Sequence, residues 1–174
     1  MKEEGFGPDR DPLVGLHNRR YILRELERHI EIYKRYGRPF ALLMVGFDNL
    51  KWVNSTFGDT GGDSVLDHLV TLMKMSVRDV DIASRCREDE FLVIMPEIEK
   101  QTAQVVGRRI AHSMSSTSFK IGPSLVDLAV SFGIASCPED GLEAEGLLQA
   151  AAKQKGRGEE GLIPGLRWSD PSSP

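Results

Sequence analysis

The sequence predicts an α/β fold with a mixed central sheet flanked by helices, and two observations support this prediction. Segments with helical periodicity alternate along the chain with apolar runs that are typical of buried strands. Residues 81–95 have the pattern of a strand, a tight turn and a second strand, which predicts one antiparallel hairpin in the sheet. The expected order of elements is therefore α-β-α-β-β-α-β-α.

Each expected element follows from a local pattern. Asn18 is suited to cap a helix that runs through Tyr36, and Gly37 supplies the left-handed residue that often ends a helix. The apolar run over 40–47 predicts a strand that is buried on both faces. The other expected elements are, in order, a loop at 58–62, a helix at 63–77, the hairpin at 81–95, a helix at 100–115, a strand at 125–137 and a helix at 142–155.

Length and composition bound the kind of protein. The 174 residues suit a single domain, which we place at 11–157 between a polar linker at 1–10 and a Gly/Pro/Ser-rich tail at 158–174. The net charge of −4 gives no broad basic field, so we expect neither nucleic acid nor a membrane as a partner. The sequence shows no long apolar stretch, signal peptide or disulfide framework, which favours a cytoplasmic location.

Five short motifs occur in a fixed order along the chain. They are DPLVGLHNRR at 11–20, KWVNSTFG at 51–58 with GD at 62–63, REDEF at 87–91, SFGIA at 131–135 and KQKGR at 153–157. Together they resemble the GGDEF domains, the diguanylate cyclases, over most of the chain. The resemblance implies a sandwich similar to the palm of nucleotide cyclases and polymerases. It also implies a reaction in which two GTP molecules, held by facing half-sites of a dimer, are joined into cyclic di-GMP.

The resemblance implies that catalytic carboxylates and divalent cations meet at the hairpin turn. Asp89 and Glu90 keep the acidic end of the family's turn motif, so they are the expected catalytic residues. Mg²⁺ prefers hard oxygen ligands, which the family supplies from the turn and from the end of the first strand. The first-strand position falls on Gly46, so Asp48 and Asp89 remain as a metal site that we expect to be weak or lost.

The two glycines of the family's turn motif are replaced by Arg87 and Glu88. If the turn keeps left-handed backbone geometry, each replacement costs roughly 1 kcal/mol or more, and the long side chains occupy space that the nucleotide needs. Alternatively, the turn adopts another type, with Arg87 paired to a nearby acid. Together with the change at Gly46, the altered turn predicts a domain that no longer catalyses the reaction.

The nucleotide-binding positions are better preserved than the catalytic ones. Asn54 and Asp63 match the family's guanine-reading pair, while Lys153 and Arg157 match its phosphate contacts. An Asp carboxylate accepts hydrogen bonds from guanine, and an Asn side chain both donates and accepts. On spacing alone, Asn54 equally suits a turn, Asp63 suits a helix N-cap, and the two basic residues suit a solvated surface.

A second candidate site precedes the hairpin. Arg78 and Asp81 match, by position, the R-x-x-D inhibitory site at which many family members bind cyclic di-GMP, and Arg109 matches an arginine that adds a further contact. Arginine offers a planar fork of donors for phosphate or guanine oxygens, and the Asp carboxylate accepts from the other guanine edge. The alternative is that Arg78 and Asp81 form a surface ion pair of little energetic weight.

Three functions fit these features. The leading hypothesis is an inactive domain of a larger signalling protein that needs no cofactor, binds cyclic di-GMP at the R-x-x-D site as a receptor, and forms a ligand-bridged homodimer. The second is an active, atypical diguanylate cyclase that uses Asp48 and Asp89. The third is a GTP-sensing or protein-interaction domain that uses Asn54 and Asp63 and takes Mg²⁺ together with GTP.

Overall fold

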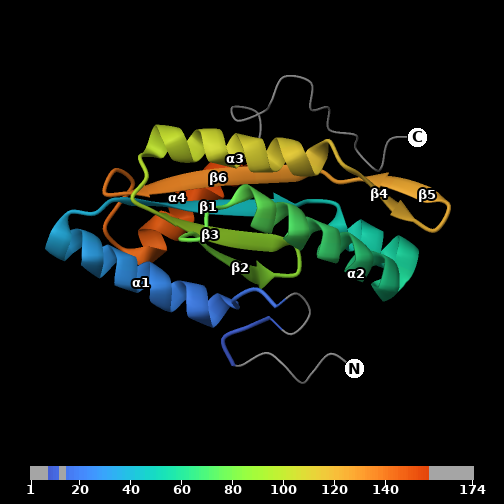
Figure 1. Ribbon diagram of the computed structural model, residues 1–174, viewed down its shortest axis with the longest axis horizontal. Helices are drawn as coiled ribbons and strands as arrows, with labels where there is room; N and C mark the ends of the chain where they lie inside the picture. Colours follow the sequence, from blue (N-terminus) through green and yellow to red (C-terminus); the bar gives the residue numbers. More distant parts are fainter. Residues whose placement is uncertain (1–7, 12–14, 157–174) are drawn as a thin grey trace.

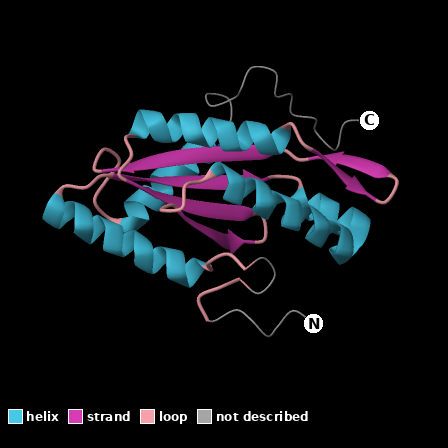
Figure 2. Cartoon of the chain, viewed as in Figure 1, coloured by secondary structure: helices cyan, strands magenta, loops and turns pink. Residues whose placement is uncertain are grey.

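The computed structural model describes residues 8–11 and 15–156, which form helices packed on an antiparallel sheet (Figures 1 and 2). The helices are α1 (Arg19–Tyr36), α2 (Leu50–Ser76), α3 (Lys100–Ser115) and α4 (Ala144–Gly156). The strands are β1 (Phe40–Phe47), β2 (Ile82–Arg87), β3 (Glu90–Pro96), β4 (Ser118–Ile121), β5 (Ser124–Asp127) and β6 (Val130–Cys137).

The main sheet has the strand order β2-β3-β1-β6, so β1 lies in its interior. The α/β fold with a central sheet flanked by helices is confirmed, but every strand pair in this sheet is antiparallel and the expected mixed sheet was wrong in that detail. The reason is the connectivity: β1 and β2 run in the same direction, yet β3 lies between them, as in a split β-α-β unit. No parallel neighbours result in this sheet.

Two apolar layers hold the helices on the sheet. Alternate side chains of β1 point to opposite faces, and all eight of its residues are buried, as predicted. One face packs against α2 and α3 through residues such as Leu43, Leu69 and Ile110. The other face packs against α1 and α4 through residues such as Leu26 and Leu147. The hairpin β4-β5 forms a separate two-stranded sheet beyond the end of the main one (Figure 1).

The expected caps of the first helix are confirmed. The Asn18 side chain accepts a hydrogen bond from the Tyr21 N–H at 3.0 Å. Gly37 adopts φ 68° and its N–H donates to the Tyr33 carbonyl at 2.7 Å, which closes the helix with a left-handed residue. The helix at 100–115 is also confirmed, and the last helix begins at Ala144, two residues later than expected.

The loop expected at 58–62 is wrong, because helical structure begins earlier and continues through most of this segment. α2 starts at Leu50, and only Gly58 leaves helical geometry, with φ 75° and ψ 176°. The strand expected at 125–137 divides into β5 and β6, and β4 precedes them. The Asn49 side chain lies at the division, where it donates to the Asp127 carbonyl at 2.9 Å and accepts from the Ala129 N–H at 2.8 Å.

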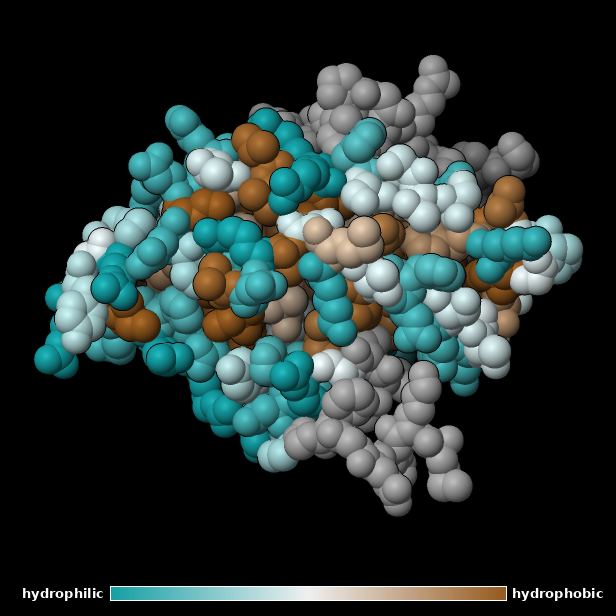
Figure 3. All heavy atoms as spheres, viewed as in Figure 1, coloured by the Kyte–Doolittle hydropathy of each residue, from teal (hydrophilic) through white to brown (hydrophobic). Residues whose placement is uncertain are grey.

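The surface in Figure 3 shows hydrophilic and hydrophobic residues interspersed. Large hydrophobic side chains are exposed on several elements, namely at Tyr36, Trp52, Met75, Val80, Val105, Leu125 and Leu142. Within residues 8–11 and 15–156, no helix has the length and apolar character needed to cross a bilayer. Both cysteines are free thiols; burial raises the pKa of Cys137, and it also raises that of Cys86.

Candidate functional site

The hairpin turn lies beside the end of the central strand. β2 ends at Arg87 and β3 begins at Glu90, so Glu88 and Asp89 form the turn between them. Glu90 pairs with Gly46 of β1, and the Phe47 N–H donates to the Asp89 carbonyl at 2.9 Å. Asp89 and Glu90, the two expected catalytic residues, therefore lie next to Gly46, where the family resemblance implies a carboxylate.

The turn accommodates its charged residues without left-handed backbone. Glu97 is the only residue other than glycine with positive φ in the described part of the chain, so Arg87 and Glu88 do not carry that strain. A register shift between Arg85 and Arg87 makes the approach to the turn irregular, and Arg85 Nη2 donates to the Glu88 carbonyl at 3.2 Å. The alternative turn type is confirmed, but Arg87 forms no ion pair with an acid among the described residues.

Acidic side chains gather around Gly46. Asp48 lies two residues further along the chain and its carboxylate accepts a hydrogen bond from Ser131 Oγ at 3.2 Å. Although Asp48 is an exposed residue, partial burial of its carboxyl group raises the pKa of Asp48. The hydrogen bond from Ser131 and the charge of Lys155 lower this pKa, whereas the negative charge of Asp89 raises it. No three His, Cys, Asp or Glu side chains converge to hold a metal ion within the described residues.

Lys155 belongs to this cluster, although the sequence motifs do not indicate it. Its ammonium nitrogen lies 3.3 Å from Glu90 Oε2. A Cβ atom placed on Gly46 would be 2.9 Å from the same nitrogen, so the ammonium lies directly over the missing side chain. The signal in the sequence is helical spacing, because Lys155 follows buried Ala151 by four residues and therefore faces the sheet.

Helix α2 carries Asn54 and Asp63, the candidate guanine-reading pair. A Cβ atom on Gly62 would collide with Asn54 Oδ1, so the absence of a side chain there lets Asn54 lie beside the backbone next to Asp63. Both residues lie inside α2, so the alternatives of a turn residue and a helix N-cap are wrong. Lys153 is exposed on α4. Arg157 lies outside the described residues.

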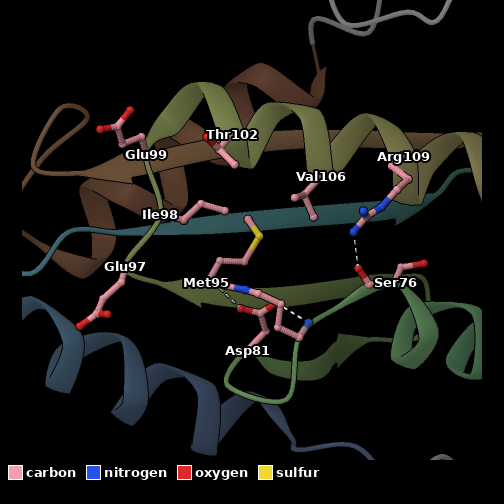
Figure 4. Close-up of a pocket in the computed structure, with 10 residues that line it drawn as sticks. Ser76, Asp81, Met95, Glu97, Ile98, Glu99, Thr102, Val106 and Arg109 are labelled. Carbon is pink, nitrogen blue, oxygen red and sulfur yellow. Dashed lines mark hydrogen bonds and ion pairs between the residues drawn. The ribbon is translucent and has the colours of Figure 1, made fainter.

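The R-x-x-D residues line a pocket of about 460 Å³ between β3 and α3 (Figure 4). Arg78 Nη2 donates to Asp81 Oδ1 at 2.9 Å and to the Pro96 carbonyl at 2.8 Å. The Arg78 N–H donates to Asp81 Oδ2 at 2.7 Å, so both carboxylate oxygens are held. The Asp81 side chain is 2% exposed, whereas that of Arg78 is 49% exposed.

Arg109 enters the same pocket from α3, so all three residues predicted for the R-x-x-D site meet there (Figure 4). Its Nη2 donates to the Ser76 carbonyl at 2.9 Å, which fixes the guanidinium at the pocket wall. The remaining lining includes apolar residues and two acids, at Met95, Glu97, Ile98, Glu99, Thr102 and Val106. The pocket thus combines two arginine forks, one held carboxylate and apolar side chains.

Known proteins resemble this chain in sequence and in fold. A family model described as "Diguanylate cyclase, GGDEF domain" matches residues 9–157. The response regulator PleD of Caulobacter vibrioides is 32% identical over 155 residues, covering 84% of this chain and 34% of PleD. The diguanylate cyclase SiaD of Pseudomonas aeruginosa, solved in complex with its activator SiaC, is 28% identical with a TM-score of 0.80, covering 88% of this chain and 58% of that one.

The GGDEF domain of DgcB from Caulobacter crescentus, solved in complex with c-di-GMP, has a TM-score of 0.80 at 22% identity and shares the fold. That match covers 90% of this chain and 93% of the DgcB chain. The chain spans about a third of the length of PleD, because the matched region makes up 34% of that protein. Because the family model extends over nearly all of the described residues, this chain belongs to the GGDEF domain family of diguanylate cyclases.

Proposed function

We propose that this domain is a cyclic di-GMP receptor that binds the dinucleotide at the pocket of Arg78, Asp81 and Arg109 and does not synthesise it. The observation that carries the proposal is the convergence of these three side chains, from two separate segments, on one pocket. The structure of the DgcB GGDEF domain in complex with c-di-GMP makes this ligand a chemically reasonable choice for the fold.

The pocket has the donors that such a ligand requires. Nη1 of Arg78 and the Nε and Nη1 groups of Arg109 make no hydrogen bond to other described residues, so they remain available for phosphate or guanine oxygens. Asp81 is fixed by Arg78 and can accept from guanine N–H groups through its remaining lone pairs. The apolar residues Met95 and Val106 offer contact surface for a base.

The state of the hairpin site supports loss of catalysis. Gly46 supplies no carboxylate, and the ammonium of Lys155 lies where that carboxylate would project. The turn carries Arg87 and Glu88, which place a positive and a negative side chain at the expected nucleotide position. A receptor role accounts for a retained arginine pocket at the end of β3 that is remote from the altered hairpin turn, and it allows the ligand to bridge two copies within a larger signalling protein.

The test is a calorimetric titration of the chain with cyclic di-GMP. We expect a Kd of about 1 µM or tighter, near −8 kcal/mol. Arg78→Ala and Arg109→Ala each remove charged hydrogen bonds and should weaken binding at least about tenfold. Arg108→Ala is the matched control, because Arg108 is an exposed neighbour on α3 that does not line the pocket. Absence of binding, or equal binding by Arg78→Ala and wild type, contradicts the proposal.

A second candidate function rests on the guanine pair. Asn54 lies against Gly62, the residue that precedes Asp63 in the chain, and this proximity supports a shared role of Asn54 and Asp63 in guanine binding. We propose GTP sensing at this half-site as the alternative to the receptor. A GTP titration tests it: Asp63→Ala should abolish binding, while Asp67→Ala, which removes an exposed acid one turn later on α2, should not. Equal GTP affinity of the Asp63→Ala and Asp67→Ala variants contradicts this assignment.

A further inference from the structure

We propose that the ammonium group of Lys155 is a built-in cation of the hairpin site, and that it excludes divalent metal ions from this half-site. The inference deepens the loss of catalysis in the proposed function and rests on that part alone. It does not involve the cyclic di-GMP pocket, which lies at the other end of β3 and on the opposite face of the sheet.

The strand register builds the position that Lys155 fills. Gly46 pairs with Glu90 on β3 and with Ser131 on β6, so these three residues form one row across neighbouring strands. This row continues the β1 face that packs against α1 and α4. Because Gly46 has no side chain, the row contains a gap, and the end of the Lys155 side chain occupies it.

Packing directs Lys155 into this gap. Gly133 of β6 lets α4 approach closely: a Cβ atom there would be 2.6 Å from the Lys155 backbone nitrogen and would collide with the Ala151 carbonyl oxygen. The start of the Lys155 side chain is therefore fixed close to the sheet. Its side chain is 22% exposed and that of Glu90 is 15% exposed, so the ion pair is largely sheltered from water.

Charge explains why a divalent ion does not fit beside this group. Lys155 has only donors and cannot be a metal ligand. A metal ion bound between Glu90 and Asp48 would experience repulsion from the ammonium, which is stronger at a sheltered site than in water. Lys155 also pairs directly with Glu90, so it occupies one of the carboxylates that a metal ion at this site would need. The residues present therefore do not fit Mg²⁺ in the way the family resemblance implies.

A metal-excluding role for Lys155 and a purely structural role predict different effects of substitution. A structural ion pair between Lys155 and Glu90 would affect the stability of the fold but not the affinity for a metal ion. A built-in cation sets the metal affinity, and any residue with a positive charge at position 155 would preserve the exclusion. Lys155→Met removes the charge and retains a long apolar side chain, whereas Lys155→Arg retains the charge.

Mn²⁺ binding to the whole chain tests this, measured as loss of the paramagnetic resonance signal of free Mn²⁺. We expect Lys155→Met to bind Mn²⁺ at least about tenfold more tightly than wild type, because a like charge within a few ångströms is removed. Gly46→Asp combined with Lys155→Met should bind most tightly, since it adds a carboxylate. Gly46→Asp alone should resemble wild type, because Lys155 would pair with the added acid.

Two controls make the result specific. Lys155→Arg should bind Mn²⁺ as weakly as wild type, and Lys120→Met, which removes an exposed lysine on β4, should also leave binding unchanged. Circular dichroism establishes that each variant is folded. If folded Lys155→Met binds Mn²⁺ no better than wild type, or if Lys155→Arg gains binding equally, the inference is overturned.

The Mn²⁺ experiment can fail independently of the proposed receptor function. A wild-type chain that converts GTP to cyclic di-GMP refutes the loss of catalysis, whatever the Mn²⁺ data show. An inactive wild-type chain whose Lys155→Met variant gains no Mn²⁺ affinity leaves the receptor proposal standing and refutes only the role of Lys155.

Discussion

Arg78 holds both carboxylate oxygens of Asp81, and the two side chains differ sharply in exposure, at 49% and 2%. The pair is therefore neither a simple surface ion pair nor a fully buried one. The buried acid is fixed in place, while the half-exposed Arg78 side chain lines the pocket. This difference in exposure suits a ligand site in which buried Asp81 holds Arg78 in position and Arg78 contacts the ligand.

We predict that Arg78→Lys destabilises the domain by about 1 kcal/mol, because an ammonium cannot replace the planar fork that reaches Asp81 and the Pro96 carbonyl together. Urea unfolding measures this change. Arg108→Lys, at an exposed position outside the pocket, should leave the free energy of unfolding unchanged. Equal stability of the two variants would show that the fork contributes nothing to the fold.

We predict that Gly133→Ala lowers the free energy of unfolding by about 2 kcal/mol, because the added Cβ would overlap backbone atoms of Ala151 and Lys155 that cannot move aside cheaply. Gly146→Ala is the matched control in α4, where an added Cβ meets nothing within 4 Å. That change should stabilise the domain by about 0.5 kcal/mol through helix propensity. If chemical denaturation ranks Gly133→Ala as the more stable variant, the packing of α4 on β6 is misassigned.

We predict a pH-dependent effect of Asp48→Asn. Partial burial raises the pKa of Asp48 above its ordinary value of 3.8, with further effects from Ser131, Lys155 and Asp89. The folded state therefore holds this proton more tightly than the unfolded state, so stability falls as pH rises above 3.8 through the folded pKa. Asp48→Asn should therefore be more stable than wild type at pH 7, and the difference should vanish as the pH falls below 3.8.

The size of this effect is limited to well under about 1 kcal/mol, because Asp48 is exposed and water screens its carboxylate. Thermal unfolding at several pH values, with the exposed Asp67→Asn as control, measures it. A stability difference that grows as pH falls would contradict the direction of the shift.

Strong local patterns predicted much of the fold. The caps at Asn18 and Gly37, the doubly buried strand at 40–47 and the helix at 100–115 depend on neighbouring residues alone, and the structure has all of them. The glycines at 61 and 62 misled the prediction, since glycine usually interrupts helices. Here both are helical, and side chains of Phe57 and Asn54 occupy the space where their Cβ atoms would be, so larger residues would not fit at these positions.

The candidate sites were predictable only in part, and for a physical reason. The meeting of Arg78, Asp81 and Arg109 follows from motif positions in a known fold, and the structure places them in one pocket. The approach of Lys155 to Gly46 depends on how closely α4 packs on β6, which no local pattern specifies. A lysine near a helix end ordinarily extends into solvent, so only its spacing from buried Ala151 indicated otherwise.

The central claim is that the domain responds to cyclic di-GMP without making it. The most direct measurement incubates the chain with GTP and Mg²⁺, at protein concentrations high enough to favour a dimer, and quantifies the dinucleotide by chromatography. The same preparation is first shown to bind added cyclic di-GMP, so that inactivity cannot be ascribed to misfolding. We predict that no cyclic di-GMP forms; steady accumulation of cyclic di-GMP that is lost in Asp89→Ala would contradict the account and identify an active cyclase.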